Sequence, residues 1–271
     1  MTLAIPGGIR AAFGGRWYLL RLLVARDLAA KYKGAILGRA WPLVIQLSQL
    51  LVFTYLFAYI FHARAAVPGL PASATTFGIW LFAGLLPWNA FAASITQGAM
   101  TIAGQPNLIK KVVFPLALLP LVPVCSAFVE SLFGVVPLIA IVAGWTHAVH
   151  FSLVLLPVVM GIQLLFTGGI AYAVAALTVF LRDTPQALGP LILLGFYATP
   201  IVYSVAMVPA AIRPFEIANP MAAIAAGYRD TIFSGSPDLP SLGWAAVISA
   251  IVAVAGFAFF RRTRGAFADV L

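Results

Sequence analysis

Residues 152–178 read SLVLLPVVMGIQLLFTGGIAYAVAALT and contain no Asp, Glu, Lys or Arg. A helix must be about 20 apolar residues long to cross the roughly 30 Å hydrocarbon layer of a bilayer. An uncharged run of this length is typical of a membrane span rather than of a helix in a soluble core. The sequence therefore predicts a membrane-spanning helix here, and further spans are sought on either side of it.

Five more apolar stretches accompany this one, which predicts six spans in all. The expected spans are 41–61, 76–98, 117–143, 152–178, 187–208 and 242–260. If residue 1 is cytoplasmic, the segments on the inner side contain 13 of the 16 Lys and Arg residues. Loops rich in Lys and Arg remain in the cytoplasm. We therefore expect an all-α integral membrane protein with six transmembrane helices and with both termini inside.

The chain divides into three parts around these spans. Residues 1–40 form an N-terminal cytoplasmic interface segment, 41–260 the six-span domain and 261–271 a cytoplasmic tail. Good helix formers dominate residues 16–33, and the cations there spread around the helix. A helix at the inner headgroup level, with its Arg side chains reaching toward the phosphates, fits this pattern.

Composition limits the function. The chain is 63% hydrophobic, only 8% charged, and has a net charge of +9. Its cations are next to spans, so contact with anionic lipid headgroups explains them better than nucleic-acid binding. Cys125 is the only cysteine, which excludes an intrachain disulfide and a Cys-based metal site. His147 and His150 have no carboxylate nearby in the sequence, so we expect no metal ion.

Residues 209–241, between the fifth and sixth spans, are the unusual outer segment. Apolar runs alternate there with prolines at 209, 214, 220, 237 and 240. The segment is too short and too broken to span the bilayer. It either re-enters the membrane, where protein or water must satisfy its irregular backbone, or forms two interfacial helices that cap the bundle.

Side chains within the spans give candidates for a substrate path. Glu130 is the charged residue deep in a span, where it either contacts substrate or a gate, or is protonated and hydrogen-bonded between helices. The aromatic side chains either stack on sugar rings or form an ordinary interfacial belt. The aromatic candidates are Phe53, Tyr55, Tyr59, Trp80, Trp88, Phe196, Tyr197 and Tyr203.

The chain carries no motif for hydrolysing ATP. A phosphate-cradling loop of the Walker type needs Gly immediately before Lys. The four lysines follow Ala30, Tyr32, Ile109 and Lys110 instead. We therefore expect a non-catalytic membrane subunit that binds no cofactor of its own.

Three stretches together resemble the membrane subunits of ABC polysaccharide exporters, the type-2 ABC permease family. The first is Arg26-Asp27-Leu28 with Lys31-Tyr32-Lys33-Gly34, followed by Leu37-Gly38 and Trp41-Pro42. The second is Asn107-Leu108-Ile109-Lys110-Lys111-Val112-Val113-Phe114-Pro115, and the third is Arg182-Asp183 followed by Phe196, Pro200-Ile201 and Tyr203. Asn219-Pro220 and Tyr228-Arg229 add a weaker match. The order of these stretches agrees over nearly the whole chain.

The resemblance implies a mechanism. Two copies of this chain would pair in the bacterial cytoplasmic membrane, and two ATPase subunits, which bind ATP and Mg, would dock beneath them. The cargo would be a lipid-linked glycan of the O-antigen, capsule or teichoic acid type. The residues that would couple to the ATPase are Arg26, Lys31, Tyr32 and Lys33 of the interface helix and Gln105, Asn107, Leu108, Ile109, Lys110 and Lys111 of a coupling helix. The same cations could instead only fix topology or bind anionic lipid.

Two other functions remain as alternatives. One is a type-2 ABC exporter of lipids or drugs. The other is a membrane-embedded enzyme acting on lipid-linked sugars, which should expose a cluster of Asp, Glu or His at one interface. Asp27, Asp183 and Asp269 are scattered along the chain and each is near cations, which argues against such an enzyme.

Overall fold

The computed structural model describes residues 9–62, 71, 73–106, 114–147, 150–203 and 205–271. Within these ranges the chain is helical and contains no strand. The α-helices are α1 Ile9–Lys31, α2 Trp41–Thr54, α3 Ala74–Ala103, α5 Leu121–Thr146, α6 Leu156–Phe180, α7 Thr184–Tyr197, α8 Arg213–Ala218, α9 Pro220–Arg229, α10 Leu239–Thr263 and α11 Phe267–Val270. Short helical turns connect them at Gly38–Ala40, Tyr55–Ile60, Leu116–Leu118, Phe151–Leu155, Val205–Met207, Asp230–Ser234 and Arg264–Ala266.

Four helical segments are long and apolar enough to cross a membrane. They are Thr75–Ala103, Leu116–Thr146, Phe151–Phe180 and Leu239–Val270, and they correspond to the expected second, third, fourth and sixth spans. The expected first span is a shorter apolar helix, α2, that continues through a π-helical segment to Ile60. The described part of the chain thus contains four helices of spanning length, and six spans remain an expectation.

The expected fifth span, 187–208, is wrong at its outer boundary. Helix α7 ends at Tyr197, and the backbone turns irregularly from Ala198. Pro200 explains this end, because proline has no N–H to donate and disfavours helical backbone in the residue before it. At 1.5 Å per residue, the 14 residues of α7 are about 21 Å long. The helix alone is therefore shorter than the roughly 30 Å hydrocarbon layer.

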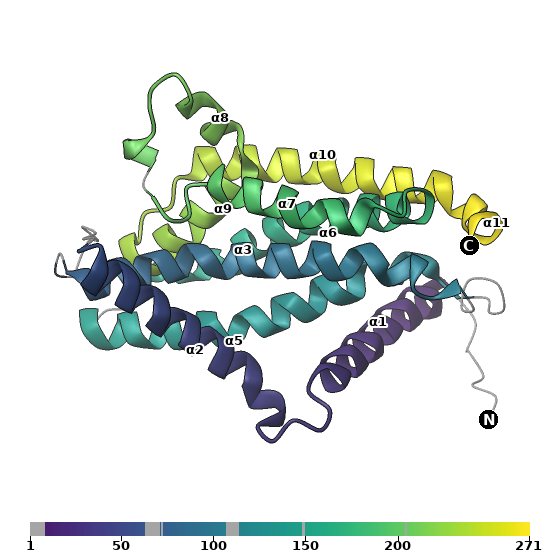
Figure 1. Ribbon diagram of the computed structural model, residues 1–271, viewed down its shortest axis with the longest axis horizontal. Coiled ribbons are helices and arrows are strands. Elements are labelled where there is room, and N and C mark those ends of the chain that lie inside the picture. The colour runs from purple at the N-terminus through teal and green to yellow at the C-terminus, as the bar shows by residue number, and fades with distance from the viewer. Residues whose placement is uncertain (1–8, 63–70, 72, 107–113, 148–149, 204) are drawn as a thin grey trace.

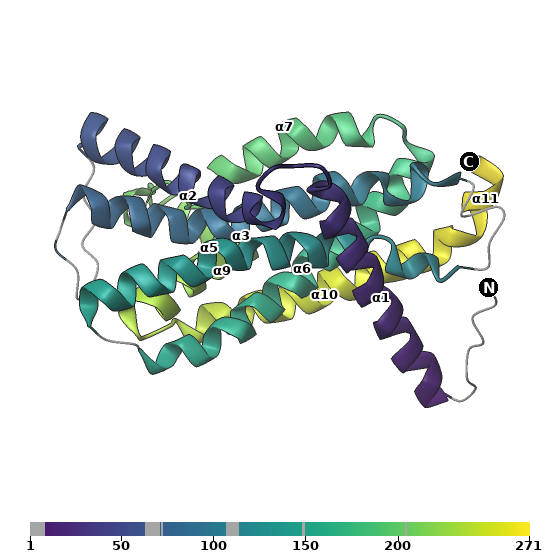
Figure 2. The ribbon, with the colours of Figure 1, turned by 90° about the horizontal axis from the view of Figure 1, so that it is seen from below.

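The long helices lie side by side in one elongated bundle (Figures 1 and 2). The start of α1, the end of α3, the α6–α7 connection and α11 gather at one end of the bundle. The starts of α3 and α6, the end of α5 and the segment around α8 and α9 lie at the other end. Helix α1 does not follow the bundle axis but crosses it obliquely (Figure 2).

Helix α3 forms the centre of the core. Leu81, Phe82, Ala83, Leu85 and Leu86 are all buried within it, against side chains of α5, α6 and α9. Helix α10 is largely exposed and packs mainly along α6. Their backbones approach closely at two glycines, where a Cβ on Gly256 would collide with the Gly169 carbonyl. Small residues at such a crossing allow close van der Waals packing between membrane helices.

The segment between α7 and α10 contains one exposed and one buried helix. Helix α8 protrudes from the bundle (Figure 1), and Phe215 and Ile217 on it are exposed. Helix α9 instead packs against α3, α6 and α10, and eight of its ten residues are buried. The π-helical turn Asp230–Ser234 continues this buried path. The segment therefore contains one helix packed into the bundle and one on its surface.

Candidate functional site

The end of α1 is bonded to the middle of α5. The Lys31 Nζ lies 3.2 and 3.3 Å from the two carboxylate oxygens of Glu130. The Tyr32 hydroxyl donates to Glu130 Oε1 at 2.9 Å. A lone carboxylate in the middle of a span costs about 2.5–3.5 kcal/mol on insertion scales, and an opposite charge with hydrogen bonds offsets that cost. This contact joins two residues predicted to couple to an ATPase with one predicted to lie on a substrate path.

The structure shows Glu130 hydrogen-bonded between helices, as one of the two interpretations from the sequence expected. The sequence did not identify its partner, which is on α1, 99 residues away in the chain. Lys31 also lies 3.7 Å from Asp27, one turn earlier on α1. Burial, followed by the hydrogen bond to Glu130, raises the pKa of the Tyr32 hydroxyl, so this hydroxyl remains a hydrogen-bond donor at neutral pH.

A cavity lies between the C-terminal part of α1 and the bundle. Its volume is about 220 Å³, and it is lined by side chains of α1, α3 and α5. Arg26 and Asp27 line it from α1, and Gln105, just beyond the end of α3, lines it from the other side. The structure therefore brings the predicted coupling residues Arg26 and Gln105 to one place. Lys33 is exposed beyond the end of α1, and the remaining predicted coupling residues, 107–111, lie outside the described residues.

Arg229 organises the opposite end of the bundle. It is 7% exposed, and its guanidinium donates to the carbonyls of Trp80, Pro200 and Ile201 at 3.1, 2.9 and 2.6 Å. The guanidinium also stacks on the Trp80 ring, 3.6 Å from its centroid. Two of these carbonyls belong to the irregular backbone beyond α7. Arg229 thus satisfies backbone groups that the early end of α7 leaves without helical partners.

Three more polar side chains connect the buried α9 to its neighbours. Asn219 caps α9 by accepting from the Met221 N–H, and it donates to Thr199 beyond α7. The Tyr228 hydroxyl donates to Gln163 on α6, and Gln163 donates to the Pro87 carbonyl on α3. These bonds give the polar groups of Asn219, Tyr228 and Gln163 partners and connect α9 to α3, α6 and the residues after α7. In the sequence, Asn219, Tyr228 and Arg229 matched the family pattern only weakly, and we predicted no role for them.

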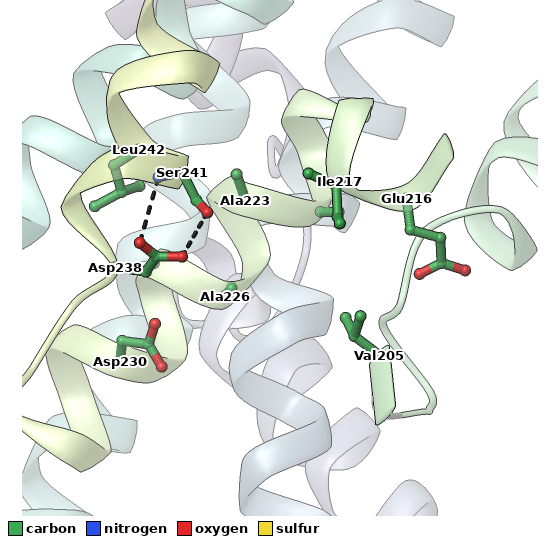
Figure 3. A pocket seen from close by; sticks show the side chains of 11 residues that line it. Val205, Glu216, Ile217, Ala223, Ala226, Asp230, Asp238, Ser241 and Leu242 are labelled. Carbon is green, nitrogen blue, oxygen red and sulfur yellow. Dashed lines mark hydrogen bonds between the residues drawn. The ribbon is translucent and has the colours of Figure 1, made fainter. Parts of the chain in front are cut away.

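A second cavity, of about 240 Å³, lies between α8, α9 and the start of α10 (Figure 3). Asp230 and Asp238 lie on one side of it and Glu216 on the other. Asp238 caps α10 through Ser241, and Glu216 accepts from the Tyr203 hydroxyl at 2.8 Å. Across the described ranges, no group of three His, Cys, Asp or Glu side chains is arranged to hold a metal ion.

The predicted aromatic candidates do not form one surface. Trp88 is buried and packs against Phe196, with ring centroids 5.8 Å apart. Phe53 and Trp80 belong to a half-buried row of rings that is completed by Phe57 and Phe77. Tyr55 and Tyr59 are an adjacent pair of exposed rings in the expected first span. Tyr197 at the end of α7 is exposed, and Tyr203 beyond it is half-buried.

Comparison with known proteins agrees with this architecture. Residues 18–233 match the family described as ABC-2 type transporter. A protein of Myxococcus xanthus named O-antigen export system permease protein RfbA is 30% identical over 254 residues, which cover 93% of this chain and 94% of that relative. Two Klebsiella pneumoniae proteins of the same name are 28% and 27% identical, and in each case the match covers 94% of this chain and 96% of the relative. The chain is therefore a member of the ABC-2 type transporter family.

Proposed function

We propose that this chain is the permease subunit of an ATP-driven exporter that moves a lipid-linked polysaccharide of the O-antigen class across the bacterial cytoplasmic membrane. The observation that carries the proposal is the match to O-antigen export permeases over more than nine-tenths of both chains. Because the sequence has no Walker-type loop, a separate ATPase supplies the energy. The names of these relatives favour a polysaccharide over the alternative of a lipid or drug.

The topology we propose has six crossings and both termini in the cytoplasm. The positions of the helix ends support this topology. The α6–α7 connection, which contains Arg182, and the arginines at the C-terminal end of α10 lie at the same end of the bundle as the start of α1. The fifth crossing consists of α7 and the irregular residues after it. Irregular backbone is tolerated at membrane depth where protein satisfies it, and Arg229 and Asn219 do so here.

In this topology, α9 and the turn after it form a re-entrant element near the outer side. Its burial against α3, α6 and α10 supports this assignment over that of interfacial caps. Two copies of the chain would enclose the glycan path at their two-fold axis, since one six-helix unit is small for a polymer. The two ATPase subunits would dock at the cytoplasmic end, against the coupling helix and the start of α1.

Co-purification tests the ATPase contact. The chain is produced together with an ABC ATPase from the same organism that carries a Walker loop, and an affinity tag on the permease is used for capture. We expect the ATPase to be retained with the wild type in equal amounts and to be lost with Lys110→Glu/Lys111→Glu, because reversed charges disfavour a docking contact. Equal recovery of the ATPase with the double variant, in membranes that contain equal permease, would refute this docking site.

A further inference from the structure

The contact of Lys31 and Tyr32 with Glu130 is the point where the interface helix is fixed to the bundle by charge. Lys31 is the last residue of α1, and Glu130 lies in the tenth position of α5. Both side chains are mostly shielded from solvent, with 22% and 17% of their areas exposed. A partly desolvated ion pair is stronger than an exposed one and resists separation when a shielded charge is left without a partner.

Lys31 has a second carboxylate within reach, on its own helix. Asp27 Oδ2 lies 3.7 Å from Lys31 Nζ, and no hydrogen-bond donor contacts that oxygen. If α1 moves away from α5, Lys31 retains Asp27, whereas Glu130 loses both Lys31 and Tyr32. The attached position is therefore favoured at rest, and separation requires work. Two discrete arrangements of this kind are what a coupling element needs.

The packing around α1 leaves space for such a movement. Leu20 and Leu23 are the buried apolar side chains on the described surface of α1. Between them and the ion pair is the 220 Å³ cavity lined by Arg26, Asp27 and Gln105. Close-packed interfaces transmit strain and do not allow sliding, whereas a cavity beside a helix permits it to shift. The C-terminal end of α1 is thus held to α5 by the ion pair, and the cavity lies beside it.

We propose that Glu130 is the positioning residue that fixes the end of the interface helix to α5, so that movement of α1 driven by the ATPase reaches the membrane bundle through this contact. The inference rests on the proposed function, because it assumes that an ATPase acts on α1. In this role Glu130 acts through Lys31 and Tyr32.

The test uses the complete complex of permease and ATPase in proteoliposomes and measures export and ATP hydrolysis together. Glu130→Gln removes the charge but can still accept from Tyr32. We expect ATPase co-purification and thermal stability close to those of the wild type, with roughly a fivefold or greater fall in export per ATP hydrolysed. Asp269→Asn, an exposed carboxylate on α11, is the control and should leave the ratio unchanged.

Charge exchange separates coupling from simple support of the fold. In an Asp27→Asn background, Lys31→Glu alone should uncouple the complex, and Lys31→Glu combined with Glu130→Lys should restore export per ATP. An unchanged ratio in Glu130→Gln overturns the inference, as does a loss that the exchanged pair fails to restore. If the wild-type complex neither binds the ATPase nor exports glycan, the proposed function itself fails, which is a different outcome.

Discussion

At the scale of single residues, Arg229 does more for this structure than any cation that the sequence singled out. Its planar guanidinium donates to three carbonyls from two separate segments and stacks on an indole. A lysine cannot reproduce this geometry, because its ammonium is a compact point charge without a planar fork. The residue therefore fixes α9 to α3 and to the broken end of α7.

Replacing this side chain tests its structural role. Arg229→Leu leaves the carbonyls of Pro200 and Ile201 without the guanidinium donor and removes its bond to the Trp80 carbonyl, and we expect a loss of about 3 kcal/mol of stability. Thermal unfolding in detergent, followed by tryptophan fluorescence, measures the change. Arg213→Leu is the matched control, since Arg213 is exposed and donates to the Val208 carbonyl. Similar melting temperatures for the two variants would contradict the role assigned to Arg229.

Gly84 provides the space that Arg229 occupies. A Cβ at this position would collide with the guanidinium. We expect Gly84→Ala to lower the melting temperature and the double variant Gly84→Ala/Arg229→Leu to lose less than the sum of the single losses, because the clash is then gone. Gly98→Ala on the same helix meets only an ordinary contact with Ala171 and is the control. Additive losses would show that the two positions are independent.

At the scale of elements, the sequence predicted the helices where the signal is local. Long apolar runs identified the four long helices, and the helix at 16–33 corresponds to α1. The end of α7 was missed, although Pro200 signals it, because the apolar run continues past the proline. The partners of Glu130 and Arg229 could not be predicted, since they lie 99 and 149 residues away and only tertiary packing brings them together.

The contact between α6 and α10 makes a prediction about glycine. A Cβ at Gly256 would collide with the backbone of α6 at Gly169, which has no side chain to rotate away. We expect Gly256→Ala to cost about 1–3 kcal/mol, as overpacking does elsewhere. Gly243→Ala on the same helix, with open space around its Cβ, should be neutral or slightly stabilising because alanine favours helix. Thermal unfolding measures the stability of both variants. Equal stability would mean that α6 and α10 can move apart at Gly256 without cost.

At the scale of the whole molecule, the bundle has two distinct ends. One end gathers the start of α1, the end of α3, the α6–α7 connection and α11, and the ion pair of Lys31 with Glu130 lies farther along α5. The other end gathers α8, the buried α9 and a cavity with three carboxylates at its walls. Helix α5 contacts α1 and continues to the other end of the bundle. The proposed topology therefore predicts that energy supplied at one end acts on a path that opens at the other.

Reconstituted transport tests the central claim most directly. Proteoliposomes are prepared with the permease alone, with the ATPase added, and with both plus ATP, and each contains a fluorescent lipid-linked oligosaccharide in the leaflet that the ATPase faces. The account predicts that the glycan becomes protected from an added impermeant glycosidase only when permease, ATPase and ATP are all present. Transport against a gradient by the permease alone, or ATP turnover by the complex without movement of the glycan, would contradict it.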